Sequence, residues 1–248
     1  MIIIKTKDEI GKMRETNRII AQLFDHIQPL IRPGMTTAEL DQEAELFIRA
    51  HNAVPAFKGY KGFPGTLCTS INEQVVHGIP GSRKLFEGDI ISIDVGALLD
   101  GFYSDAARTF AVGKIGKKEQ ALMDATSKAL EEGIKQAIPG NHLSDISVAI
   151  QKVVESAGFS VVRDFVGHGI GRSLHEDPQI PNFGKKGMGP ILEPGMTFAL
   201  EPMVNMGTWR IKILDDGWTA ITADGLPSAH FENSIAVTNN GPIILTSK

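Results

Sequence analysis

The chain has 248 residues, of which 42% are hydrophobic, and a formal net charge of −4 at pH 7. This composition is typical of a globular protein with a large core, and the negative charge argues against a general nucleic-acid-binding surface. The single cysteine excludes an internal disulfide and favours a reducing, cytoplasmic setting. The apolar run in MIIIKTKDEI is too short for a signal peptide or a membrane span, so we expect no membrane association.

Two helices are predicted at the start of the chain. Thr6 and Glu9 form a capping-box pattern, and the apolar spacing that follows predicts a helix ending at the Pro-Gly pair 33–34. A second capping box at 36–39 predicts another helix, which ends near Asn52.

A loop and a hairpin are predicted next. Residues 54–70 are rich in glycine and proline, which indicates a loop. The apolar runs 90–98 and 101–112 predict two strands, joined by a favoured Asp-Gly turn at 100–101.

This hairpin contains two unusual carboxylates. Asp94 and Asp105 should lie on facing strands within a residue or two of register, so both side chains can reach one point in space. A carboxylate inside an apolar run such as Ile90–Val95 is costly to bury unless something neutralises it.

The second half of the chain resembles the first. Residues 117–138 predict a helix that ends at a Pro-Gly pair, and a further helix ends at Gly158. The segment that leads into IISID resembles the one that leads into MTFALE, an alignment that sets Asp94 against Glu201. Likewise VVHGIP at 75–80 resembles VGHGIG at 166–171.

From these matches we predict an α+β fold with two related halves packed about a pseudo-two-fold axis. The halves would be residues 1–112 and 113–248, with side chains from both meeting in the middle. No linker separates them, so we expect one domain over residues 1–248.

Five residues of metal-ligand type lie inside or beside apolar, strand-like runs: Asp94, Asp105, His168, Glu201 and Glu232. Oxygen ligands with one imidazole suit Mn, Fe, Co or Zn rather than a thiolate site. Four carboxylates carry too much charge for one small divalent ion, so two adjacent ions are expected. Two-metal sites of this kind activate water for hydrolysis.

Several motifs resemble those of the type I methionine aminopeptidases. They are INEQVVHGIP (71–80), IDVGALLDGFYSDAARTF (93–110), GHGIGRSLHEDP (167–178), FALEPM (198–203) and HFEN (230–233). The resemblance spans nearly the whole chain and implies the pita-bread fold, a dinuclear metal centre and removal of the initiator methionine. No long insertion lies between His168 and Glu232, as in the short bacterial form.

The resemblance also implies roles for the candidate residues. Asp105 and Glu232 would bridge both ions, Asp94 would complete one metal site, and His168 with Glu201 would complete the other. Glu201 would also shuttle a proton.

His77 and His175 would contact the scissile amide. His175 would also stabilise the developing oxyanion as a hydrogen-bond donor, with Glu176 orienting its ring. The remaining histidines, His26, His51, His142 and His230, are interpreted as structural.

A methionine side chain needs an apolar pocket with polarizable walls. By resemblance this pocket would be lined by Tyr60, Phe63, Cys68, Trp218 and Phe57. One residue departs from the family pattern: Leu174 stands where an aromatic residue usually precedes the second histidine, so a roomier wall is expected.

The resemblance further implies a monovalent cation held by backbone carbonyls near Asn72, Gln74 and Ser228. The expected substrate is a nascent polypeptide with an N-terminal methionine followed by a small residue. The family role implies contacts at the ribosome exit region, and a monomer is expected.

Three other functions remain open at this point. A cysteine hydrolase built on Cys68 would need a thiolate paired with a histidine, and it would leave the buried carboxylates unexplained. A proline-directed peptidase of the same fold usually carries an extra N-terminal domain. A non-catalytic binding protein on this fold would be expected to have lost metal ligands.

Overall fold

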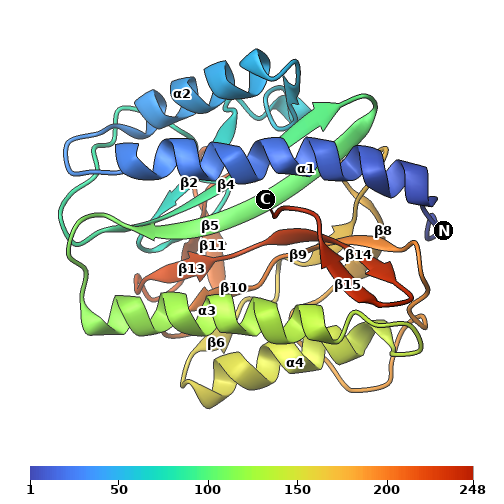
Figure 1. Cartoon of the computed structure of the whole chain (residues 1–248). Helices are drawn as coiled ribbons and strands as arrows, with labels where there is room; N and C mark the ends of the chain where they lie inside the picture. Colours follow the sequence, from blue (N-terminus) through green and yellow to red (C-terminus); the bar gives the residue numbers. More distant parts are fainter. Residues whose placement is uncertain (248) are drawn as a thin grey trace.

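Two pairs of helices lie on opposite sides of a set of antiparallel strands (Figure 1). The structure is a computed structural model, and it describes residues 1–247. The α-helices of this part are α1 (Lys7–Ile27), α2 (Thr37–Ala50), α3 (Lys117–Lys135) and α4 (Leu143–Ser156), and the short 3₁₀ helices are η1 (Gln28–Leu30) and η2 (Tyr60–Gly62). In Figure 1, α1 and α2 lie above the strands, and α3 and α4 lie below them.

The strands form several antiparallel sheets. They are β1 (Val54–Pro55), β2 (Leu67–Ile71), β3 (Gln74–Val76), β4 (Ile90–Leu99), β5 (Phe102–Ala111), β6 (Ser160–Val161), β7 (Gly167–Gly169), β8 (Glu176–Ile180), β9 (Thr197–Leu200), β10 (Met203–Asn205), β11 (Ile211–Ile213), β12 (Ala220–Thr222), β13 (Ser228–His230), β14 (Asn233–Thr238) and β15 (Gly241–Ile244).

The N-terminal helices begin where the capping boxes predict. The Thr6 side chain accepts a hydrogen bond from the backbone N–H of Glu9, and the Glu9 side chain accepts one from the backbone of Thr6. Thr36 and Glu39 make the same reciprocal pair at the start of α2. Both predicted helices are confirmed, although α1 ends at Ile27 and one 3₁₀ turn follows it.

The predicted hairpin is confirmed, and one predicted loop is partly wrong. In the β4–β5 pair Asp94 lies opposite Ala107, and Asp105 lies opposite Gly96, two residues along from Asp94. Residues 67–71, however, form the fully buried strand β2, which pairs with β4. The segment LCTSI mixes small polar and apolar residues and lies beside glycines and prolines, so it carries no alternating strand pattern.

The second half repeats this arrangement. Helices α3 and α4 confirm the predicted pair, and their apolar faces share a core with residues of β9 and β14. The sheet on this side has the order β15-β14-β9-β7-β8. The α+β fold with two similar halves is therefore confirmed, whereas the division at residue 112 within one domain stays a prediction.

The two halves are joined by hydrogen bonds between β5 and residues 230–234. The Ser234 hydroxyl donates to the backbone carbonyl of Asp105, and the Glu232 N–H donates to the carbonyl of Ala107 at 2.9 Å. These bonds hold Asp105 and Glu232 close to each other, where the two halves meet. Within the described residues, no helix is long and apolar enough to cross a membrane.

Candidate metal centre and substrate pocket

One cavity brings together the predicted metal ligands, the two predicted catalytic histidines and the predicted methionine-pocket residues. It is lined by Phe57, Tyr60, Lys61, Phe63, Cys68, Val76, His77, Asp94, Asp105, His168, Leu174, His175, Glu201, Trp218 and Glu232. These side chains come from both halves of the molecule, and the acidic and imidazole groups share the cavity with an aromatic wall.

The acidic end of the cavity has the geometry of a metal centre. Ligand atoms of Asp105, His168 and Glu232 all lie within 4.8 Å of one another. Nε2 of His168 lies 3.5 Å from Oε1 of Glu201 and 3.7 Å from Oδ2 of Asp105. Asp94, on the neighbouring strand β4, lines the same cavity.

The ring of His168 is oriented as a metal ligand. Its Nδ1 donates a hydrogen bond of 2.8 Å to the carbonyl of Gly169, so the unprotonated Nε2 faces the carboxylates. Burial lowers the pKa of His168 to about 4. The ring is therefore neutral near pH 7, with a lone pair directed at the acidic cluster.

The four carboxyl groups are strongly desolvated. Burial raises the pKa of Asp94 to about 7, and it raises the pKa of Asp105, Glu201 and Glu232 well above the ordinary value. For Asp105 the charges of Glu232 and Asp94 add to this effect. Carboxylates held this close together repel one another unless protons or cations neutralise them.

The unsatisfied oxygens fit a divalent cation. Oδ1 of Asp94, Oδ1 of Asp105 and Oε1 of Glu232 are buried, and none has a hydrogen-bond partner among the described residues. Buried polar atoms without protein partners are rare and are typical of sites that bind an ion or a water. Several carboxylate oxygens and one imidazole nitrogen form the ligand set of a hard or borderline divalent ion.

His77 and His175 both line the cavity. His77 has a left-handed backbone with φ of 60°, and its ring meets the rings of Phe165 and Trp218 edge-on. Burial lowers the pKa of His77 to about 4. The ring of His175 lies 4.3 Å from that of His168, measured between centroids.

The prediction that Glu176 orients the ring of His175 is wrong. The hydroxyl of Tyr60, and not the carboxylate of Glu176, contacts its ring, with 2.9 Å between the hydroxyl oxygen and Nδ1. Glu176 instead accepts hydrogen bonds from Lys5 and from the backbone of Arg172. Adjacent residues of an extended segment direct their side chains to opposite sides, so Glu176 faces away from the cavity.

The predicted methionine pocket is one apolar cluster. Phe57, Phe63, Cys68 and Leu174 are buried together, and Tyr60 and Trp218 pack against them. The rings of Phe63 and Trp218 meet edge-on with centroids 5.1 Å apart. Burial raises the pKa of the Cys68 thiol well above its ordinary value, which is the opposite of what a thiolate nucleophile requires.

Two further residues belong to the site. His230, interpreted from the sequence as structural, is 1% exposed, and its Nε2 lies 4.0 Å from Oε2 of Glu201. Its position two residues before Glu232 is the only signal in the sequence. Lys61 lines the cavity. Partial desolvation lowers the pKa of His175, and the positive charge of Lys61 lowers it further.

The residues expected to hold a monovalent cation lie close together. The backbone N–H of Ser228 donates to the carbonyl of Asn72 at 2.8 Å, and Gln74 begins β3 two residues later. None of these three residues is among those that line the cavity.

A buried carboxylate–histidine cluster between two similar α+β halves defines a metallopeptidase of the pita-bread fold. In agreement, residues 11–239 match the model of metallopeptidase family M24, and the chain belongs to this family. More particularly, it belongs to the methionine aminopeptidases. It is 56% identical to the methionine aminopeptidase of Clostridium perfringens over 99% of both chains.

The solved structures support the same placement. The crystal structure of methionine aminopeptidase from Thermotoga maritima has a TM-score of 0.98 and 48% identity, with full coverage of both chains. Prolidase from Pyrococcus furiosus shares the fold with a TM-score of 0.79, but it is 24% identical and this chain covers 66% of its length. The use of a divalent metal follows from the family and from the buried ligand cluster.

Proposed function

We propose that this protein removes the N-terminal methionine from nascent polypeptides whose second residue is small. The observation that carries the proposal is that the acidic cluster and an apolar, aromatic cluster line the same cavity. An N-terminal methionine in the apolar part would bring its peptide carbonyl to the acidic part. The relatives of known activity, methionine aminopeptidases at about half identity over the full chain, support this reading.

Two divalent ions, Mn, Fe, Co or Zn, are proposed for the acidic cluster. Asp105 and Glu232 would contact both ions, while Asp94 would complete one site, and His168 with Glu201 the other. When bound, such ions lower the pKa of a coordinated water and polarise the scissile carbonyl. Four carboxylates neutralise two divalent charges, which accounts for their number.

The other polar residues of the cavity act on the peptide. Glu201 would accept a proton from the attacking water and deliver it to the leaving amide nitrogen. His77 and His175 would hold the scissile amide between them. The N–H of His175 would donate to the carbonyl oxygen as negative charge develops on it.

The methionine side chain would lie against Tyr60, Phe63, Cys68 and Trp218, with Phe57 behind them. The polarizable thioether suits such aromatic walls. Leu174 forms the remaining wall, and its side chain is smaller than an aromatic ring. We therefore propose a pocket that still accepts methionine but is roomier at this wall.

The cellular setting is also proposed. The single, buried cysteine suits a reducing cytoplasm. Nascent chains as substrates imply work near the ribosome exit, and we propose a monomer. We further propose one monovalent cation at the backbone carbonyls near Asn72, Gln74 and Ser228.

The test is methionine release from Met-Gly-Met-Met by metal-free protein titrated with Mn, Fe, Co and Zn. We expect metal-dependent release that is lost in His168→Ala, and faster cleavage of Met-Ala than of Met-Lys peptides. Gly-Pro and Ala-Pro-Ala serve as control substrates. Cleavage of the proline substrates alone would identify the protein as a proline-directed peptidase of this fold. Inactivity with every metal would favour a non-catalytic binding protein.

The cysteine hydrolase is tested separately. We expect Cys68→Ser to keep most of the methionine release and Glu201→Gln to lose it by about a hundredfold or more, the usual effect of removing a general acid–base. The reverse result would establish the thiol as the nucleophile.

A further inference from the structure

A buried ion pair joins the N-terminal segment to Glu176, the residue that follows the cavity-lining Leu174 and His175. Nζ of Lys5 lies 2.6 Å from Oε2 of Glu176, and their side chains are 2% and 6% exposed. Lys5 lies outside the motifs that carry the family resemblance and does not line the cavity. Charged pairs are costly to bury and add little net stability compared with apolar residues of the same size, so another role should be sought.

Glu176 uses its second oxygen to hold the loop before it. Oε1 accepts hydrogen bonds from the backbone N–H groups of Arg172 at 2.8 Å and Ser173 at 3.2 Å. One carboxylate therefore binds Lys5 on one side and the loop backbone on the other. The same loop continues through Leu174 and His175, the two residues that face the cavity.

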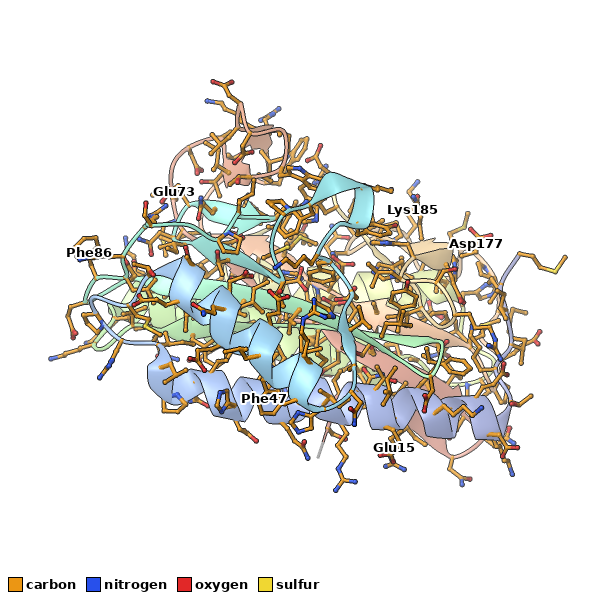
Figure 2. The ribbon with its side chains drawn as sticks, turned by 90° about the horizontal axis from the view of Figure 1, so that it is seen from above. Glu15, Phe47, Glu73, Phe86, Asp177 and Lys185 are labelled. Carbon is orange, nitrogen blue, oxygen red and sulfur yellow. The ribbon has the colours of Figure 1, made fainter. Side chains whose placement is uncertain are left out.

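Lys5 is itself firmly placed. Its backbone N–H donates to the carbonyl of Gly195 at 2.8 Å, and Nζ also donates to the carbonyl of Ile3. A Cβ atom on Gly171 would lie 2.3 Å from Cε of Lys5, so the start of the loop packs directly against the lysine side chain. The N-terminal ammonium contacts Asp177, which lies beside the N-terminal segment at the edge of the molecule in Figure 2.

The His175 ring has little room to move. Its Nδ1 lies 2.9 Å from the Tyr60 hydroxyl, and its centroid lies 4.3 Å from that of His168. A small shift of the loop would break the first contact or alter the second. Displacements of about 1 Å in a reacting geometry can cost up to about a hundredfold in rate.

We propose that Lys5 is a positioning residue, which acts through Glu176 to fix the loop that carries His175. The inference rests on the proposed methionine release, because it assigns His175 to the scissile carbonyl. The N-terminal segment is then part of the active-site scaffold.

The first test is Lys5→Met, which removes the charged group and keeps an unbranched side chain only one atom shorter. We expect kcat for Met-Gly-Met-Met to fall about tenfold, with KM within about twofold and metal stoichiometry by calorimetry unchanged. The matched control is Lys7→Met, because Lys7 is exposed and only two residues away. Wild-type kcat in Lys5→Met would overturn the proposal.

A double-mutant cycle separates positioning from a general structural role. In the His175→Ala background, Lys5→Met should cause no further loss of kcat, because the residue it positions is gone. An equal loss in both backgrounds would overturn the proposal. If Lys5→Met does not fold, Glu176→Gln serves instead, since the amide oxygen still accepts from Arg172 and Ser173 while the attraction to Lys5 is weakened.

A spectroscopic measurement makes the result independent of turnover. The ¹⁵N ring resonances of His175, assigned by their absence in His175→Ala, should shift in Lys5→Met and stay unchanged in Lys7→Met. Unchanged His175 resonances in Lys5→Met would overturn the proposal. If wild-type protein releases no methionine, the proposed function fails, and this spectrum still decides whether Lys5 fixes the ring.

Discussion

The contact between Tyr60 and His175 shows how one side chain sets the chemistry of another. The hydroxyl lies 2.9 Å from Nδ1, and the rings stack with centroids 5.4 Å apart. Partial desolvation lowers the pKa of His175, and Lys61 lowers it further, so the ring is neutral near pH 7. A neutral ring that accepts the hydroxyl at Nδ1 carries its own proton on Nε2, the nitrogen left free to donate to a substrate.

Removing the Tyr60 hydroxyl should therefore slow the reaction without weakening substrate binding. We expect Tyr60→Phe to lower kcat for Met-Gly-Met-Met by about tenfold, the effect of roughly one hydrogen bond, with little change in KM because the ring is retained. Steady-state kinetics at saturating metal measures both constants. Tyr103→Phe, the same change at a residue outside the cavity lining, is the control and should behave as wild type. Equal kcat in Tyr60→Phe and wild type would contradict the assignment.

At the scale of elements, the turn after β3 is held unusually close to β2. The N–H of Thr69 donates to the carbonyl of Gly78 at 2.7 Å, and Gly78 donates to the Ser70 hydroxyl. A Cβ atom on Gly78 would lie 2.2 Å from the carbonyl oxygen of Thr69, closer than any packing allows. The preceding residue, His77, has a left-handed backbone with φ of 60°.

Adding one methyl group here should disturb both stability and the site. We expect Gly78→Ala to lower the free energy of unfolding by about 2 kcal/mol, since overpacking of this kind typically costs 1–3 kcal/mol. It should also lower kcat, because β3 must move away from β2 and take His77 with it. Urea unfolding and peptide kinetics measure the two effects.

Gly81→Ala is the matched control, because a Cβ atom at Gly81 meets nothing within 4 Å. Its free energy of unfolding should stay within about 0.5 kcal/mol of wild type. Equal stability of the two variants would show that β2 and the turn at Gly78 separate without cost.

Elements that carry local sequence signals are the ones that the sequence predicts. Capping boxes, Pro-Gly stops and the Asp-Gly turn are local signals, and they placed α1, α2 and the β4–β5 hairpin correctly. Strand β2 was missed because its stability comes from burial against β4 and not from its own pattern. Tertiary contacts override local preference in such segments.

The site likewise has some residues that the sequence predicts and some contacts that it does not. Carboxylates such as Asp94 inside apolar runs are visible in the sequence, because burial of a lone charge demands an explanation. The contacts of Tyr60 with His175 and of Lys5 with Glu176 span 115 and 171 positions, and neither leaves a local signal. His230 looks like an ordinary core residue until its distance to Glu201 is known.

At the scale of the whole molecule, the metal centre is where the two halves meet. Asp94 and Asp105 come from β4 and β5, while His168 comes from β7 and Glu201 directly follows β9. Bonds from residues 230–234 to β5 close the seam between the halves. Charge repulsion in the cluster thus acts directly on the contact between the halves, and a cation that removes the repulsion should stabilise the whole fold.

The size of this stabilisation should depend on pH. Folding raises the pKa of Asp94 from 3.8 to about 7 and raises those of the other three carboxyls, so the metal-free folded chain binds more protons than the unfolded chain. The stability that these protonated carboxyls contribute is therefore present below about pH 4 and is lost as pH rises through about 7. Metal ions must displace these protons, whereas His168, with a pKa of about 4, is already neutral.

We accordingly expect the gain in Tm on adding Mn or Co to metal-free protein to grow by about 3 °C or more between roughly pH 5.5 and pH 7.5, which for a chain of this size is a change of about 1 kcal/mol or more. Calorimetric metal titrations in two buffers of different ionisation enthalpy should show proton release at the lower pH. In Asp94→Asn the release should be smaller, because one of the displaced protons is absent. A Tm gain that stays constant over this range, with no proton release, would mean that the carboxyls are ionised before metal binds and that the repulsion between them is relieved by other groups.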